Sequence, residues 1–247
     1  MKKVMVVTGA SRGIGASIAR HAGRAGYSVA VNYRDQAAKA EDVVKAIEAD
    51  GGEAKAFQAD VSIEEDVVRL FNEVDEALGP VTHLANNAGI MLVDLVEDMK
   101  ADDMARLWAI NITGSFLCAR EAIKRMSTKH GGKGGAIVNL SSIAGKKGGR
   151  GERVPYAASK GAINTMTLGL ATEVAGEGIR VNAALPGLVD TDMHEPWGGK
   201  KRIATIGPTI PLGRAGVPDD VGAAVVWLMS DEASFITGEL LEIGGGS

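Results

Sequence analysis

Residues 4–15 read VMVVTGASRGIG, a short apolar run followed by a glycine-rich turn. The run has the length and composition of a buried strand, and helical periodicity begins at Ile14. Gly9, Gly13 and Gly15 would let the backbone turn sharply and approach a ligand closely. The start of a helix also favours a phosphate group, so this stretch predicts a dinucleotide site. Its G-x-x-x-G-x-G spacing differs from the usual G-x-G-x-x-G, and a turn packed only for its own sake is the alternative.

The rest of the chain repeats this alternation of short apolar runs and longer helical stretches. It predicts an α/β fold with a doubly wound parallel sheet and helices on both faces. We expect strands at 4–8, 27–33, 53–60, 81–87, 135–141, 178–186 and 239–243. We expect helices at 14–25, 37–49, 64–78, 101–126, 156–174 and 218–228.

No linker divides the chain, so we expect a single domain over residues 1–247. Residues 192–208 contain Gly and Pro and have little periodicity, which is typical of a loop that covers a site. We therefore expect a substrate lid within residues 190–216.

Composition excludes several classes of function. The 247 residues carry a formal net charge of −4, which argues against a nucleic-acid partner. No apolar stretch approaches the ~20 residues needed to cross a bilayer, and no cluster of His and Cys suggests a metal. The single cysteine, Cys118, cannot form an intrachain disulfide, which favours a reducing, cytoplasmic location.

The end of the second strand indicates which dinucleotide would bind. An NAD site usually places an acidic residue there, but this strand ends Asn32-Tyr33-Arg34, with Asp35 next. Arg34 and Arg12 could together neutralise a 2′-phosphate, which favours NADP(H) and leaves use of NAD(H) open. Two solvated surface arginines are the alternative. Asp60, at the end of the third strand, could accept a hydrogen bond from the adenine amino group.

A pair of residues in VPYAASKG (154–161) points to proton transfer. Tyr156 and Lys160 are four residues apart in a predicted helix and so share a face. A nearby ammonium would lower the tyrosine pKa from its usual value of about 10. Ser142 follows the predicted strand at 135–141, at the edge of the sheet where such folds bind ligands. An isolated Y-x-x-x-K is more often an ordinary helical turn.

Six segments in order resemble the short-chain dehydrogenase/reductase family over nearly the whole chain. They are TGASRGIG (8–15), NNAG (86–89), AINITG (109–114), LSS (140–142), YAASK (156–160) and PGLVDT (186–191). The resemblance implies a Rossmann-type sheet of about seven strands. The loop at 143–155 is about one residue longer than the family's spacing, which leaves Ser141 as an alternative to Ser142. Ser142 is favoured because Ile143-Ala144-Gly145 is similar to the family's continuation.

The resemblance also implies a role for each matching residue. Tyr156 would exchange a proton with the substrate oxygen, and Ser142 would hydrogen-bond that oxygen. Lys160 would hold the nicotinamide ribose and lower the tyrosine pKa, and Asn111 would support a water-linked proton path to Lys160. The predicted cofactor-binding residues are Gly9, Ser11, Arg12, Gly13, Ile14, Gly15, Asn32, Tyr33, Arg34, Asp60, Val61, Asn87, Ala88, Gly89, Tyr156, Lys160, Pro186, Gly187, Val189 and Thr191.

These observations predict an NADP(H)-preferring oxidoreductase that interconverts a carbonyl and a secondary alcohol on a small-molecule substrate. The motif set is similar both to 3-oxoacyl-carrier-protein reductases and to bacterial glucose 1-dehydrogenases. A non-catalytic dinucleotide sensor is the alternative of a different class. The resemblance implies a homotetramer. The basic residues of segment 120–133 could receive a carrier protein, or could form a solvated helix face.

Overall fold

The structure is a computed structural model that describes residues 2–149 and 151–247. Met1 and Arg150, both inside the predicted domain, lie outside the described residues, as do the side chains of Pro196 and Trp197 in the predicted lid.

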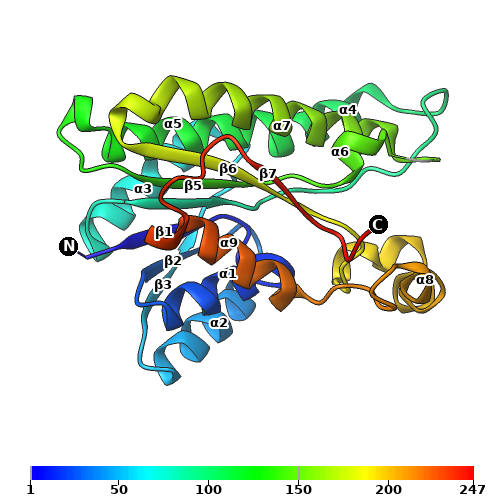
Figure 1. Cartoon of the computed structure of the whole chain (residues 1–247), viewed down its shortest axis with the longest axis horizontal. Coiled ribbons are helices and arrows are strands. Elements are labelled where there is room, and N and C mark those ends of the chain that lie inside the picture. Colours follow the sequence, from blue (N-terminus) through cyan, green and yellow to red (C-terminus); the bar gives the residue numbers. More distant parts are fainter. Residues whose placement is uncertain (1, 150) are drawn as a thin grey trace.

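Within the described residues, seven parallel strands form one sheet in the order β3-β2-β1-β4-β5-β6-β7. The first strand of the chain therefore lies near the middle of the sheet, between β2 and β4 (Figure 1). The strands are β1 (Val4–Val7), β2 (Ser28–Tyr33), β3 (Glu53–Gln58), β4 (His83–Asn86), β5 (Gly135–Leu140), β6 (Ile179–Pro186) and β7 (Leu240–Ile243).

Helices cover both faces of this sheet. Figure 1 shows α1, α2 and α9 on one face and α3, α5 and α7 on the other, with α8 beyond one end of β6 and β7. The helices are α1 (Gly13–Arg24), α2 (Ala37–Ala49), α3 (Glu64–Leu78), α4 (Ala101–Trp108), α5 (Gly114–Met126), α6 (Ala144–Lys147), α7 (Val154–Val174), α8 (Gly199–Ile206) and α9 (Pro218–Met229).

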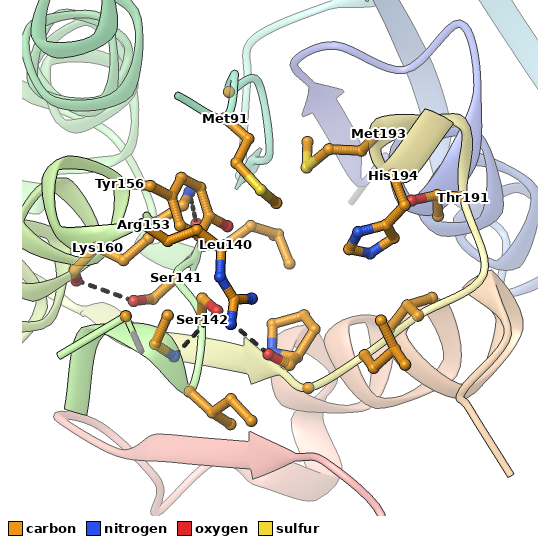
Figure 2. Close-up of a pocket in the computed structure, with 18 of the residues that line it drawn as sticks. Met91, Leu140, Ser141, Ser142, Arg153, Tyr156, Lys160, Thr191, Met193 and His194 are labelled. Carbon is orange, nitrogen blue, oxygen red and sulfur yellow. Dashed lines mark hydrogen bonds between the residues drawn. The ribbon is translucent and has the colours of Figure 1, made fainter. Parts of the chain in front are cut away.

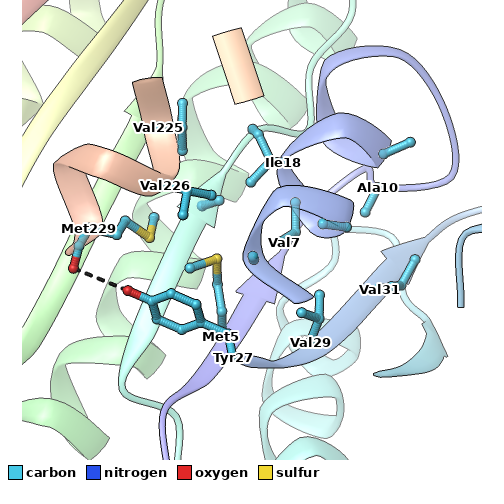
Figure 3. Close-up of a cluster of buried hydrophobic side chains, with 14 of the residues drawn as sticks. Met5, Val7, Ala10, Ile18, Tyr27, Val29, Val31, Val225, Val226 and Met229 are labelled. Atoms are coloured by element: carbon cyan, nitrogen blue, oxygen red, sulfur yellow. Dashed lines mark hydrogen bonds between the residues drawn. The ribbon is translucent and has the colours of Figure 1, made fainter. Parts of the chain in front are cut away.

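The sheet is held by two apolar cores, one on each face. In β1, Met5 and Val7 pack into the core under α1, α2 and α9, whereas Val4 and Val6 pack into the opposite core. Alternate side chains point to opposite faces of a strand, so a strand buried on both faces must be apolar throughout. Figure 3 shows the first core, where Tyr27 closes the cluster and donates a hydrogen bond to the Met229 carbonyl.

The prediction of a doubly wound parallel α/β sheet is confirmed, and the bounds of α2 and α3 agree with the predicted 37–49 and 64–78. Two segments differ from expectation. The predicted helix at 101–126 is interrupted by a π-helical turn, Ala109–Thr113. The weakly patterned segment 192–208 contains α8, a helix too short to produce a clear periodicity.

Candidate active site

The glycine turn after β1 depends on close contact with the end of β4. Gly9 and Gly13 have φ of +62° and +56°, which other residues rarely adopt. A Cβ atom on Gly15 would lie 2.5 Å from the Asn87 side-chain amide and 2.5 Å from the Gly9 carbonyl. Glycine is therefore required at these positions by backbone conformation or by space.

Side chains from both strands fix this contact. The Thr8 hydroxyl accepts hydrogen bonds from the backbone N–H groups of Asn87 and Ala88, both at 2.9 Å. In return, the Asn87 side-chain amide donates to the carbonyls of Thr8 and Gly9, at 2.8 and 3.1 Å. These four hydrogen bonds hold the glycine turn against the end of β4.

A cavity of about 410 Å³ opens over this turn, at the carboxyl ends of β1 to β4. We call it the nucleotide cavity. Helix α1 begins beside it at Gly13, with no side chain capping its first N–H groups and no acidic residue in its first turn. Because its first N–H groups have no side-chain partner and its first turn holds no carboxylate, the start of α1 suits a phosphate group. The residues present therefore fit a dinucleotide.

The polar residues at the end of β2 have two different functions. The buried Asn32 side chain accepts from the Gly9 N–H at 3.1 Å and donates to the Phe57 and Ala59 carbonyls, so it braces the turn. Arg34 extends to the outside, where its Nε lies 2.5 Å from an Asp35 carboxylate oxygen. Arg12 lies across the same cavity and is similarly exposed.

A second cavity of about 600 Å³ adjoins the first, and we call it the substrate cavity. The two share Gly89, Met91, Thr191 and Met193 among their lining residues. Every predicted cofactor-binding residue lines one cavity or the other. Segments of sequence that are far apart are thus brought together as the motifs predict.

Tyr156 and Ser142 meet on the wall of the substrate cavity. Both side chains are buried on this wall (Figure 2), and Ser142 is close enough to Tyr156 to lower its pKa. The neighbouring Ser141 is also buried, but it donates to the Lys160 carbonyl at 3.0 Å and pairs with Asn164 Oδ1 at 2.6 Å. The structure therefore places Ser142, and not Ser141, beside the Tyr156 hydroxyl.

Lys160 lies below the tyrosine ring, with its ammonium 5.8 Å from the ring centroid. Its Nζ donates to the Leu140 carbonyl at 2.7 Å. Burial lowers the pKa of Lys160 to about 8. Burial raises the pKa of Tyr156 to about 12, because desolvation of the phenolate outweighs the lowering by Ser142 and Arg153. A lowering of the tyrosine pKa by Lys160 stays a prediction.

Asn111 lies behind this site, in the π-helical turn between α4 and α5. Its side chain accepts from the Ile90 N–H at 2.8 Å and donates to the Ile90 carbonyl at 2.9 Å, and it also donates to Ser159 Oγ at 3.0 Å. A Cβ atom on Gly89 would lie 3.3 Å from Asn111 Oδ1 and 3.6 Å from Lys160 Nζ. Gly89 thus lets both polar groups come close to the cavity.

Arg153 and Arg202 also line the substrate cavity, and the sequence reasoning missed both. Arg153 comes three residues before Tyr156, and that helical spacing could have indicated it. Arg202 lies on α8, within the predicted lid, where no motif singles it out.

Acidic neighbours neutralise the first part of the basic segment 120–133. Arg120 pairs with Glu64 at 2.7 Å, and Lys124 pairs with Glu121 at 2.8 Å. Arg125 pairs with Asp75. These ion pairs favour the solvated helix face over the carrier-protein surface.

Over the residues that the structure describes, no group of three or more His, Cys, Asp or Glu side chains could hold a metal ion. The same described residues include no helix long and apolar enough to cross a membrane.

Comparison with known proteins places this geometry in a family. A family model described as enoyl-(acyl carrier protein) reductase matches residues 9–247. The chain is 47% identical to uncharacterized oxidoreductase YgfF of Escherichia coli, over 98% of this chain and 99% of that one. It is 39% identical to 3beta-hydroxysteroid dehydrogenase 1 of Eggerthella lenta, over 99% and 93% of the two chains. It is also 39% identical to the 3-oxoacyl-[acyl-carrier-protein] reductase FabG of Staphylococcus aureus, over 100% and 98%.

Proposed function

The chain belongs to the short-chain dehydrogenase/reductase family, and we propose that it interconverts a carbonyl and a secondary alcohol with NADP(H) in preference to NAD(H). The family makes it an NAD(P)-dependent oxidoreductase that acts on CH–OH groups. The observation that carries the proposal is the Tyr156–Ser142 pair, which lies in a cavity that adjoins the nucleotide cavity.

The chain's own residues would manage the proton and the orientation of the substrate. A nicotinamide dinucleotide, when bound, would supply or accept the hydride. Tyr156 would donate its proton to the carbonyl oxygen during reduction, while Ser142 hydrogen-bonds the same oxygen. Because burial raises the pKa of Tyr156 to about 12, the tyrosine is protonated at neutral pH, as reduction requires. The buried Lys160 ammonium, 5.8 Å from the ring, would favour the phenolate that remains.

The first experiment is the substitution Tyr156→Phe, which removes only the hydroxyl. We expect kcat to fall by at least about a hundredfold, since general acid catalysis contributes about that much. Binding of NADPH, measured by its fluorescence, should be preserved. The matched control is Tyr27→Phe, because Tyr27 lies in the core under α9. Full carbonyl-reducing activity in Tyr156→Phe would contradict the mechanism, and binding of NADP(H) with no turnover of any carbonyl would favour a sensor.

The preference for NADP(H) rests on Arg12 and Arg34, the two cations that line the outer part of the nucleotide cavity. Asp35 beside Arg34 could instead receive a ribose hydroxyl, so the preference is relative. We expect Arg34→Ala to weaken NADPH binding by about tenfold or more, because a charge-assisted contact would be lost. NADH binding should change little, and Arg24→Ala, which breaks an exposed pair with Asp50, serves as the control. Equal affinities for the two cofactors in the wild type, unchanged by Arg34→Ala, would contradict the assignment.

Two specific activities remain candidates. Reduction of a 3-oxoacyl thioester is supported by the similarity to FabG, and oxidation of glucose by the resemblance of the motifs. The similarly close hydroxysteroid dehydrogenase indicates that relatives at this identity differ in substrate. Turnover of acetoacetyl thioesters with NADPH and of glucose with NADP would separate the two, and activity on neither would contradict both.

We also infer a cytoplasmic homotetramer. Exposed large apolar side chains on α5 and α7 support association, among them Phe116 at 51% and Leu168 at 47% exposure. The single, buried Cys118 suits a reducing compartment.

A further inference from the structure

The substrate cavity has an unusual balance of charge for a site that acts on neutral carbonyls and alcohols. Lys147, Arg153 and Arg202 line it together with His194, in addition to Lys160 beneath the tyrosine. Among the described residues, no Asp or Glu side chain lines the cavity. A concave site with charges of one sign attracts a ligand of the opposite sign.

Arg153 and His194 come from opposite sides of the cavity. Arg153 directly precedes the first residue of α7, and Figure 2 shows its side chain directed into the cavity on the side of Tyr156 and Ser142. His194 lies across the cavity in the same view, and Arg202 follows it on α8. Arg153, His194 and Arg202 also line a smaller hollow that adjoins the cavity. The three groups therefore surround one region beside the catalytic tyrosine.

The proximity of Arg153, His194 and Arg202 disfavours the charged forms of Arg153 and His194. Burial and then the charge of Arg202 lower the pKa of Arg153. Burial lowers the pKa of His194 as well, and Arg202 and Arg153 lower it further. Like charges held together in this way are stabilised by an anion that binds between them.

Two acidic side chains of the described residues act on or lie near these groups. Asp190 acts on His194, and the exposed Glu152 lines the adjoining hollow. Within residues 2–149 and 151–247, no ion pair involves Arg202 or Lys147. The remaining walls are largely apolar, with Met91, Leu188, Met193, Ile206 and Ile210 among them.

We propose that the substrate is an oxo acid or the corresponding hydroxy acid, whose carboxylate binds Arg153 and Arg202 while its carbonyl faces Tyr156 and Ser142. The planar guanidinium groups suit a carboxylate, which can accept two parallel hydrogen bonds. The apolar walls would hold the carbon chain between the two ends. This inference rests on the proposed function, because it names the substrate class of the same site.

The cations could serve the reaction in another way, since the positive charge of Arg153 favours the phenolate of Tyr156. That role would affect every substrate alike, whereas a carboxylate site distinguishes an acid from its ester. The comparison of acid with ester therefore separates the two roles.

The test uses 3-oxobutanoate, 4-oxopentanoate and 5-oxohexanoate, each with its methyl ester, because the series varies the distance between carbonyl and carboxylate. We expect at least one acid to exceed its ester in kcat/KM by about tenfold or more, which corresponds to one charge-assisted contact. Arg202→Gln should lower kcat/KM for that acid by about ten- to a hundredfold, and for the ester by much less. Lys201→Gln is the matched control, since Lys201 is on the same helix and lines neither cavity.

Equal kcat/KM for acid and ester throughout the series, or an equal loss on both in Arg202→Gln, would overturn the inference and leave the proposed function intact. Binding of 5-oxohexanoate, measured by calorimetry with NADP present, provides a readout that needs no turnover. Binding that Arg202→Gln abolishes supports the anion site even if no carbonyl is reduced, a result that would reject the proposed function alone. Absence of binding together with absence of turnover would reject both.

Discussion

Two adjacent serines after β5 have different surroundings: the Ser141 hydroxyl is bonded inside the protein, and Ser142 faces the substrate cavity. Ser141 directs its hydroxyl into the protein, toward the Lys160 carbonyl and Asn164. Ser142 faces the substrate cavity, where it meets Tyr156 and accepts from the Ala144 N–H at 3.1 Å. The alternation of side chains along an extended segment produces this difference.

The two serines should therefore respond differently to the same substitution. Ser142→Ala should lower kcat on the order of a hundredfold, since it removes a donor to the reacting oxygen. It should also lower the free energy of unfolding by about 1 kcal/mol, because the Ala144 N–H and the Pro186 carbonyl lose a partner. Ser141→Ala should lower the free energy of unfolding by about 1–3 kcal/mol, because it leaves buried polar groups unpaired. Steady-state kinetics and thermal unfolding of both variants check this. The reverse pattern would identify Ser141 as the residue that contacts the substrate.

At this scale the sequence could predict residues that belong to motifs, but not those that specify the substrate. Tyr156, Lys160 and Ser142 are recognisable because they stand in segments that resemble the family's motifs, whereas the helical spacing of Tyr156 and Lys160 alone is common. Arg202 reaches the cavity only through the path of segment 192–208, which no local pattern determines. The sequence also could not predict the pKa of Tyr156, because that pKa depends on burial, and burial is known only from the folded chain.

Among the elements, the start of α1 has a strict steric requirement beside the nucleotide cavity. Gly15→Ala would place a methyl group against the Asn87 amide and the Gly9 carbonyl. We expect weaker NADPH binding, because the turn must shift, and a loss of stability of about 1–3 kcal/mol from overpacking. NADPH fluorescence titration and chemical denaturation measure the two effects.

Gly169→Ala in α7 is the matched control, since its added Cβ would meet nothing within 4 Å. That variant should gain about 0.5–1 kcal/mol, because alanine is the better helix former, and should bind NADPH normally. Similar behaviour of the two variants would show that the turn has room to adapt.

The elements themselves could largely be predicted, and the exceptions have physical causes. Helices α2 and α3 have strong periodicity and are followed by glycines, so the sequence predicts where each begins and ends. The π-helical turn at Ala109–Thr113 leaves the composition helical, so its wider turn is seen only in the backbone of the folded chain. Short helices such as α8 bury too few residues to produce a pattern.

For the whole molecule, a buried histidine at the start of β4 links stability to pH. Burial lowers the pKa of His83 from 6.5 to about 4, and its ring packs edge-on against Tyr27 at 4.8 Å. Between these values the unfolded chain binds a proton that the folded chain does not, so stability falls as pH falls from 6.5 to about 4. The loss attributable to His83 is about 3 kcal/mol.

Urea denaturation of His83→Gln across this range should give a shallower dependence on pH than the wild type. The slope is the measured quantity, because the substitution also changes packing against Tyr27. His130→Gln, at an exposed position on the loop after α5, should keep the wild-type slope. An unchanged slope in His83→Gln would assign the acid sensitivity to other groups.

The central position of β1 also governs the order in which the protein can assemble during synthesis. β1 pairs with β4, with Met5 opposite His83, so β1 must wait until β4 has been synthesised before its second edge is covered. Thr8 cannot engage Asn87 until then, whereas Tyr156 and α8 emerge much later. A nascent chain therefore contains every residue of the glycine turn and of its contact with β4 well before it contains Tyr156.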